Sequence, residues 1–190
     1  MIRIGILGKI GSGKSYVAKN FGYPVFDADF EVSELYSKNK KIFTKLNKSI
    51  PEHISSFPID KNEIIKAILS NRTNFKKIIN IVHKEIRKKL NLFMKKNKSK
   101  KIVIMDIPLL LENKLNNKKD ILIFIESKKI DIEKRLKKRT GFNIKLINKF
   151  RKIQFKADFK KRKSNYIIKN DYTKRSIRRS IKNILNEILE

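Results

Sequence analysis

The hydrophobic positions of this chain form two recurring patterns, short apolar runs and longer stretches with helical spacing. The short runs contain few polar residues, which is typical of strands that are buried on both faces of a sheet. Five such runs stand out: IRIGIL at 2–7, YPVFDAD at 23–29, IVIMD at 102–106, DILIFIES at 120–127 and NYIIKN at 165–170.

The segments between these runs have apolar residues at the spacing of amphipathic helices. The clearest is FKKIINIVHKEIRKKLNLFM at 75–94, within a stretch from 31 to 96 that we expect to be mostly helical with breaks near 49–60. Further helices are predicted at 14–22, 129–139, 140–163 and 173–190. Strands that alternate with helices predict a doubly wound α/β fold, a three-layer arrangement in which helices cover both faces of a parallel sheet, within one domain.

The composition excludes several kinds of site. The 190 residues include no cysteine, which excludes disulfides, thiolate metal sites and cysteine nucleophiles. With two histidines, His53 and His83, a multi-histidine metal centre is not expected. No apolar stretch approaches the roughly 18 residues of a membrane helix, and the opening MIRIGIL has the pattern of a strand rather than of a signal peptide. We therefore expect a cytoplasmic protein that does not bind a membrane.

The formal net charge is +30, from 48 Lys and Arg against 18 Asp and Glu. An excess of this size can bind nucleic acid by releasing counterions. The first 35 residues nevertheless contain four basic and four acidic side chains, and the excess further on is scattered lysine in a chain rich in Ile and Asn. These three residue types share AT-rich codons. Codon bias and polyphosphate binding therefore explain the charge, with a dedicated nucleic-acid surface as the alternative, and no specific nucleic-acid partner is expected.

Three glycines and a Lys-Ser pair gather where the first apolar run meets the first predicted helix. Their spacing, Gly8-x4-Gly13-Lys14-Ser15 with Gly11 between, is that of the loop that wraps nucleotide phosphates. Glycine lets the backbone aim several N–H groups at phosphate oxygens. Lys14 is expected to reach the β- and γ-phosphates of ATP, and the Ser15 hydroxyl to bind Mg²⁺. The alternative of a glycine turn and a helix cap is disfavoured, because the motif lies between a strand and a helix.

Carboxylates follow two other runs. Asp27 and Asp29 in the segment DAD come after the second run, where a carboxylate can orient an acceptor hydroxyl and take its proton. On these residues alone, the simpler explanation for Asp29 is an N-cap of the helix that FEVSELY predicts. Asp106 ends the third run, where it is expected to hold a magnesium-bound water near Ser15, unless it is an ordinary polar strand end.

Basic side chains after the fourth run are candidates for a lid over the nucleotide. Arg135, Arg139 and Arg151 each offer a planar fork of donors that suits phosphate oxygens. A segment that carries them could close over ATP and exclude water, whereas the simpler explanation for each is a solvated surface. For His83, in the long predicted helix, the simpler explanation is a packed or half-exposed side chain.

Taken together, these segments resemble the dephospho-coenzyme A kinase family nearly end to end. The loop alone occurs in many families, whereas DAD soon after it and DIPLLLE further on are far more specific. The resemblance implies an enzyme that uses ATP and Mg²⁺ to phosphorylate the ribose 3′-hydroxyl of dephospho-coenzyme A, the last step of coenzyme A synthesis. It is carried by GILGKIGSGKSYVAKNFG, VFDAD, FPIDKNEIIKAILSN, INIVHKEI, VIMDIPLLLE and ADF…NYIIKND.

The resemblance also implies a division of labour along the chain. Residues 1–36 and 100–190 would form the ATP-binding core, with a lid near 137–155, and the mostly helical residues 37–99 would receive the acceptor. The implied catalytic residues are Asp29 as general base, Lys14 and Arg139. The implied ATP-binding residues are Gly8, Lys9, Ile10, Gly11, Ser12, Gly13, Lys14, Ser15, Tyr16, Arg139 and Asn170. The implied acceptor-binding residues are Asp29, His83, Pro108, Leu109 and Glu112, and the metal-binding residues are Ser15 and, through water, Asp106.

The chain departs from the family pattern at several positions. Lys9, Tyr16, Lys61 and Lys84 stand where the family usually has glycine, threonine, arginine and proline. Two alternatives therefore stay open at this point. One is another small-molecule kinase of the same fold, with a nucleoside monophosphate or a sugar-like acceptor, and the other is a basic ATPase or nucleic-acid-binding module.

Overall fold

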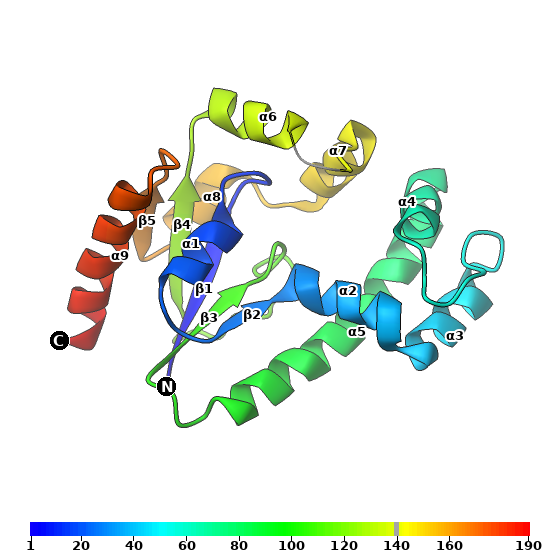
Figure 1. The fold of residues 1–190 in the computed structure, drawn as a ribbon, viewed down its shortest axis with the longest axis horizontal. Coiled ribbons are helices and arrows are strands. Elements are labelled where there is room, and N and C mark those ends of the chain that lie inside the picture. Colours follow the sequence, from blue (N-terminus) through cyan, green and yellow to red (C-terminus); the bar gives the residue numbers. More distant parts are fainter. Residues whose placement is uncertain (139–140) are drawn as a thin grey trace. The chain divides into compact units, whose positions relative to one another are not determined.

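The computed structural model describes residues 1–138 and 141–190, which form strands and helices (Figure 1). The chain divides into two compact units. The first contains Met1–Asp27, Asn97–Phe142 and Ile153–Glu190, and the second contains Ala28–Lys96 and Asn143–Lys152. All strands of the described residues belong to the first unit, and the second is helical. The predicted α/β class with a parallel sheet is confirmed, and the predicted division of labour stays a prediction.

Five parallel strands form the sheet, in the order β2-β3-β1-β4-β5. Parallel pairing brings the carboxyl ends of all strands to one edge, where α/β proteins bind their ligands. In the register of this sheet, Gly8 lies opposite Ile125, and Asp27 lies opposite Asp106. The glycine motif and the predicted acidic positions therefore begin at the same edge. The strands are β1 (Ile2–Gly8), β2 (Val25–Asp27), β3 (Ile102–Asp106), β4 (Ile121–Glu126) and β5 (Tyr166–Lys169).

Apolar side chains between the sheet and two helices form the main core of the first unit. The helices are α1 (Lys14–Asn20) and α9 (Lys174–Leu189), and most of the core side chains are isoleucines, whose branched Cβ suits a pleated surface. The helices α6 (Lys129–Lys137) and α8 (Ala157–Arg162) complete the unit. The buried set is Ile4, Ile6, Val17, Ala18, Phe21, Ile102, Ile104, Ile123, Ile125, Ile168, Ile177, Ile181 and Ile184.

The loop after β3 is pressed closely against β1. A Cβ atom at Gly5 would lie 2.5 Å from Cδ2 of Leu110 and 2.9 Å from Cδ2 of Leu122. These distances are shorter than side chains tolerate, so the absence of a side chain at Gly5 lets the loop approach the sheet. Leu110 is completely buried there.

The second unit contains α2 (Ala28–Lys38), α3 (Lys40–Ser49), α4 (Lys61–Ser70), α5 (Arg72–Lys96) and most of α7 (Ile144–Ile153). Side-chain caps start two of these helices, because Asn39 accepts a hydrogen bond from Ile42 N and Asp60 accepts one from Asn62 N. The ring of Phe150 packs edge-on against Phe75, with centroids 5.5 Å apart. That contact ties α7 to α5 across a long stretch of sequence.

Two predicted boundaries are wrong in detail. The second strand ends at Asp27, and α2 begins at Ala28, so Asp29 lies in the first turn of a helix, where a negative charge is favourable. The helix predicted over 140–163 is two helices, α7 and α8. At the break, Phe155 N donates to Oε1 of Glu112 (2.8 Å) instead of to a helical carbonyl.

A largely buried ion pair fixes the start of β1. Arg3 meets the carboxylate of Asp120 twice, with Nε 3.0 Å from Oδ1 and Nη2 3.0 Å from Oδ2. Asp120 also accepts a hydrogen bond from Asn117 N (2.8 Å), and its side chain is 2% exposed. Burial raises the pKa of Asp120 even though these donors act to lower it. The pair therefore links β1 to the turn that precedes β4.

Replacing Arg3 with methionine should lower the free energy of unfolding by about 3–5 kcal/mol, because it leaves a buried carboxyl group without its counter-charge. Urea denaturation at neutral pH measures the change. The matched control is Lys38→Met, which breaks an exposed pair with Glu34 (2.7 Å) and should cost about 0.5 kcal/mol or less. Equal losses in the two variants would contradict a structural role for the Arg3 pair.

Candidate functional site

The glycine motif forms a tight loop between β1 and α1. Gly8, Gly11 and Gly13 have φ angles of 152°, 87° and 89°, which residues with a Cβ rarely adopt. Space is also restricted, since a Cβ at Gly11 would lie 2.9 Å from Cγ of Leu136 and one at Gly13 2.4 Å from Nδ2 of Asn170. The loop from Gly8 to Ser15, called the phosphate loop below, therefore requires glycine at these positions.

Side chains from distant parts of the first unit hold two carbonyl groups of the phosphate loop. Nδ2 of Asn170 (2.8 Å) and Oγ of Ser127 (3.0 Å) both donate to the carbonyl of Ser12. The hydroxyl of Tyr172 donates to the carbonyl of Gly11 (3.1 Å). The loop thus has a defined shape before any ligand binds.

The polar side chains of the phosphate loop differ in exposure. Ser15 is exposed, as is Tyr16 directly after the loop, whereas Ser12 is 1% exposed and its hydroxyl has no hydrogen-bond partner among the described residues. The ammonium of Lys14 donates to the carbonyls of Gly8 (3.4 Å) and Lys9 (3.1 Å). Lys14 therefore curls back over the loop. Ile10, also predicted to bind ATP, is half-buried.

The predicted acidic residues occupy the ends of β2 and β3 and the helix that follows β2. Asp106 is 4% exposed, and Asp27 lies opposite it in the register. The chain passes from the first unit to the second between Asp27 and Ala28, so Asp29 belongs to the second unit. Its place inside the first turn of α2 corrects the alternative of a helix N-cap, because α2 already begins at Ala28.

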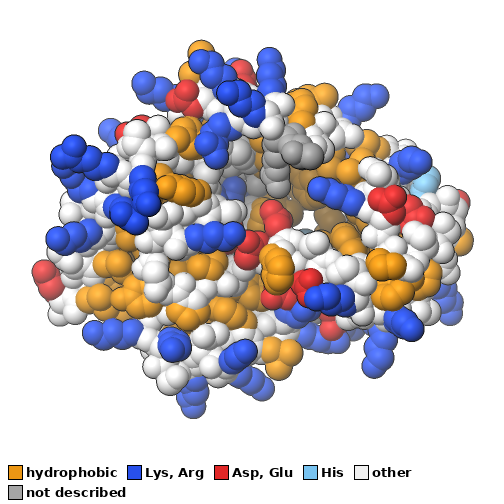
Figure 2. Space-filling view, viewed as in Figure 1, with side chains coloured by type: hydrophobic (Ala, Val, Ile, Leu, Met, Phe, Trp, Pro, Cys, Tyr) orange, Lys and Arg blue, Asp and Glu red, His pale blue; other side chains and the backbone are white. Residues whose placement is uncertain are grey.

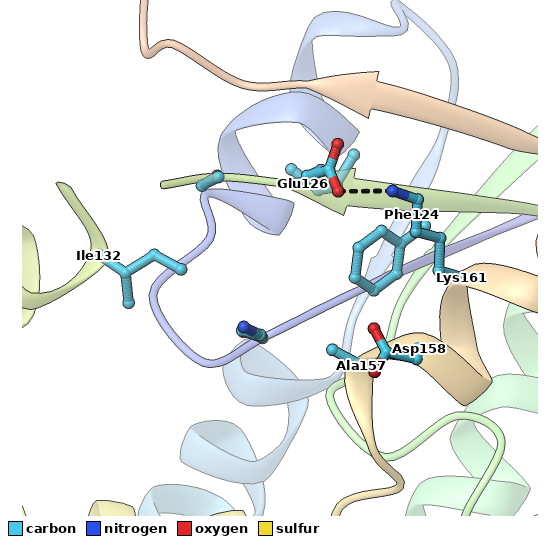
Figure 3. A pocket seen from close by; sticks show the side chains of 9 residues that line it. Phe124, Glu126, Ile132, Ala157, Asp158 and Lys161 are labelled. Carbon is cyan, nitrogen blue, oxygen red and sulfur yellow. Dashed lines mark hydrogen bonds and ion pairs between the residues drawn. The ribbon is translucent and has the colours of Figure 1, made fainter. Parts of the chain in front are cut away.

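A small cavity of about 130 Å³ lies beside the phosphate loop in the first unit (Figure 3). Lys9 lines it together with the end of β4 and with α8. Figure 3 shows Lys161 joined to Glu126 (2.7 Å), near Phe124 and Asp158. Both signs of charge line the cavity, so Lys9 is placed in a mixed polar environment.

The loop after β3 is linked to the segment between α7 and α8. Oε1 of Glu112 forms an ion pair with Nζ of Lys160 (2.7 Å) and accepts a hydrogen bond from N of Phe155 (2.8 Å). The side chains of Glu112 and Lys160 are 8% and 3% exposed. Nε2 of Gln154 donates to the carbonyl of Pro108 (3.2 Å). These contacts fix the loop segment that contains half-buried Pro108, buried Leu109 and half-buried Glu112.

The three candidate lid arginines lie in different parts of the chain and differ in their contacts. Arg139 lies outside the described residues. The guanidinium of Arg135 stacks over the ring of Tyr172, 4.4 Å from its centroid, which places it beside the phosphate loop. Arg151, in α7, bonds to Asn148 (3.3 Å) within its own helix and belongs to the second unit.

His83 lies in α5 of the second unit and is half-buried. Burial, with a smaller contribution from the positive charge of Arg87, holds the pKa of His83 below its ordinary value of 6.5. A neutral imidazole can both donate and accept a hydrogen bond. Of the five predicted acceptor residues, Asp29 and His83 thus belong to the second unit and the others to the first.

The residues of the first unit are better suited to bind a nucleoside triphosphate than to form a metal site of their own. Its glycine cradle excludes any Cβ and retains the buried hydroxyl of Ser12 without a protein partner among the described residues. No group of three or more His, Cys, Asp or Glu that could hold a metal occurs in the described part of the chain. Ser15 and Asp106 suit Mg²⁺ that is held mainly by phosphates and water, the usual arrangement for this ion.

One face of the molecule shows how charged side chains are distributed over it. In Figure 2, Lys and Arg side chains are scattered over the visible face, with hydrophobic and acidic side chains between them. This distribution resembles a solvated lysine-rich surface more than a single nucleic-acid groove. No helix among the described residues has the length and apolar character needed to cross a membrane.

Ser127, Lys160 and Tyr172 were missed by sequence reasoning. Ser127 and Tyr172 lie 115 and 161 residues from the loop positions that they contact, and no local motif marks them. Ser127 follows the end of β4, and Tyr172 lies three residues after the end of β5. These positions were a usable signal, since the ends of parallel strands lie at the same sheet edge as the glycine motif.

Comparisons with known proteins show the family and the fold. Residues 2–175 match the protein family described as dephospho-CoA kinase. A dephospho-CoA kinase from Wolbachia sp. subsp. Brugia malayi (strain TRS) is 33% identical over 190 residues, with 97% of each chain covered. A crystal structure of a protein from Thermus thermophilus has a TM-score of 0.77 at 26% identity, with 98% of this chain and 97% of that chain covered. A dephospho-CoA kinase from Campylobacter jejuni shares the fold, with a TM-score of 0.62 at 22% identity and coverage of 98% and 96%.

We expect His83 to titrate below 6.5, because burial disfavours its charged form. Since its folded pKa is lower than its unfolded pKa, the stability that neutral His83 contributes is present above about pH 6.5 and is lost as the pH falls below it. An NMR titration of the imidazole resonances, assigned with His83→Gln, measures the pKa. A midpoint at or above 6.5 would show that the ring is not buried as described.

Proposed function

The chain belongs to the dephospho-CoA kinase family and is an enzyme of that activity, and we propose that it transfers the γ-phosphoryl group of ATP to the ribose 3′-hydroxyl of dephospho-coenzyme A. The products are ADP and coenzyme A. The observation that carries this proposal is the phosphate loop, whose glycines at positive φ leave no room for side chains and whose position is the carboxyl edge of a parallel sheet. The family match over residues 2–175 supports the choice of acceptor.

The phosphate loop is proposed to bind the triphosphate of ATP. Lys14 would exchange its contacts with the carbonyls of Gly8 and Lys9 for phosphate oxygens, and so stabilise the charge that spreads over the transferred group. Mg²⁺, bound by the Ser15 hydroxyl and through water by Asp106, would neutralise further charge on the phosphates. Tyr16 and Ile10 are proposed to complete the loop around the nucleotide.

Asp29 is proposed to act as the general base. Its carboxylate would accept the proton of the acceptor hydroxyl while holding that oxygen in line with the γ-phosphorus. Support comes from the covalent chain, since two residues span at most about 7 Å, which keeps Asp29 close to Asp27 at the end of β2. No covalent enzyme intermediate is needed, because catalysis of this kind depends on positioning and on charge stabilisation.

The acceptor side is proposed to include His83, Pro108, Leu109 and Glu112. One oxygen of Glu112 already forms an ion pair with Lys160 and accepts a hydrogen bond from Phe155 N, so we assign Glu112 the task of shaping the wall that Pro108 and Leu109 offer. The segment 137–155, with Arg139, is proposed to act as the lid that excludes water from the reaction.

An assay that couples ADP release to NADH oxidation tests the proposed reaction. The protein is given ATP, Mg²⁺ and dephospho-coenzyme A, with AMP, CMP and shikimate as parallel acceptors. We expect turnover with dephospho-coenzyme A and none above background with the other three. Turnover with another acceptor alone would keep the phosphate loop and discard every acceptor-side assignment.

Replacing Asp29 with asparagine should lower kcat by roughly 100-fold or more, the scale of a lost general base, while ATP binding is kept. Glu31→Gln is the matched control, because Glu31 lies in the same first turn of α2 and the change removes the same charge. Glu31 forms an ion pair with Lys89 (2.6 Å) rather than serving the reaction, so its variant should turn over normally. Near-normal kcat in Asp29→Asn would remove Asp29 from the proposed role.

A further inference from the structure

The carbonyl of Ser12 is held by two donors that approach from outside the phosphate loop. Asn170 donates through Nδ2 at 2.8 Å, and Ser127 donates through its hydroxyl at 3.0 Å. Asn170 is 4% exposed and Ser12 is 1% exposed, so these hydrogen bonds are shielded from water. A buried carbonyl that lost both donors would carry the cost of an unsatisfied polar group.

Holding this carbonyl also sets the direction of an N–H group. In a planar trans peptide the C=O and the N–H point to opposite sides. The carbonyl of Ser12 and the N–H of Gly13 belong to the same peptide plane. When the oxygen is fixed toward Asn170 and Ser127, the N–H of Gly13 is directed away from them. Orienting loop N–H groups in this way is what an anion cradle requires.

The other half of the Asn170 amide is occupied as well. Its Oδ1 accepts a hydrogen bond from Tyr172 N (2.8 Å) and so supports a residue whose φ is 63°, in the left-handed region. In that conformation the hydroxyl of Tyr172 reaches the carbonyl of Gly11 (3.1 Å). Asn170 therefore acts on the loop directly and also through Tyr172.

Gly13 and Asn170 are mutually fitted. A Cβ on Gly13 would lie 2.4 Å from Nδ2 of Asn170, well inside the contact distance of the two atoms. The absence of a side chain at Gly13 thus allows the amide to come close enough to bond with the carbonyl of the preceding residue.

We infer that Asn170 is a positioning residue for the phosphate loop, which orients the peptide between Ser12 and Gly13 toward the phosphates, and that it is not a contact for the adenosine part of ATP. The inference rests on the proposed function only in taking phosphates as the ligand of the loop. Both polar atoms of its side chain already have protein partners. The same reasoning assigns supporting roles to Ser127 and Tyr172.

Calorimetric titration of Asn170→Leu with ATP and with inorganic tripolyphosphate, both with Mg²⁺, tests the inference. Leucine has a similar shape and no charge but cannot donate. Because tripolyphosphate has no adenosine, a positioning role predicts that both ligands bind more weakly by the same factor, about tenfold. The matched control is Asn165→Leu at the other end of β5, where Asn165 accepts a hydrogen bond from Leu122 N (2.9 Å) and is far along the strand from the loop. It should leave both affinities unchanged.

Weaker binding of ATP with unchanged binding of tripolyphosphate would overturn the inference, since it would make Asn170 a contact for adenosine. Unchanged binding of both ligands would also overturn it. If Asn170→Leu does not fold, Ser127→Ala and Tyr172→Phe each remove a single donor and should weaken both ligands equally, by about threefold. Measurements on the unmodified protein distinguish a failure of the proposed reaction from a failure of this inference. If that protein binds tripolyphosphate but does not turn over dephospho-coenzyme A, only the proposed reaction is contradicted.

Discussion

Parallel pairing of β1 with β3 and β4 is the constraint on which the rest of the first unit depends. It brings the carboxyl end of every described strand to one edge, so the glycine motif after β1 starts beside residues that follow the other strands. Asp27 and Asp106 become neighbours by register, although the sequence separates them widely. The glycine-rich turn therefore acquires its chemical surroundings from the sheet and not from adjacent sequence.

Buried polar contacts then fix the segments that the sheet leaves irregular. Arg3 and Asp120 hold the turn before β4, and Glu112 and Lys160 hold the loop after β3. Such pairs specify one arrangement because losing either partner leaves a charge in a poorly solvated position. The many exposed lysines contribute differently, through solubility and general attraction to anions.

The parts of the molecule that local sequence determines could be predicted. Apolar runs located all five strands of the described residues, helical spacing located the long helix α5, and the glycine spacing located the phosphate loop. The break between α7 and α8 could not be predicted, because the N–H of Phe155 leaves the helix for Glu112, which is remote in sequence. The same limit applies to Asn170, where the resemblance pointed to ATP but gave no sign of the hydrogen bond to Ser12. The assigned catalytic roles stay predictions.

The close fit of Gly13 to Asn170 has a consequence for how such a loop can be transplanted. Copying Gly8 to Ser15 into another strand–helix junction would move the glycines but leave behind Ser127, Asn170 and Tyr172, which arrive from beyond β4 and β5. A recipient scaffold without equivalent donors would have the motif but not the fixed peptide orientation. The fixed shape of the loop is therefore a property of the whole sheet, because it depends on residues that follow β4 and β5 as well as on the glycines after β1.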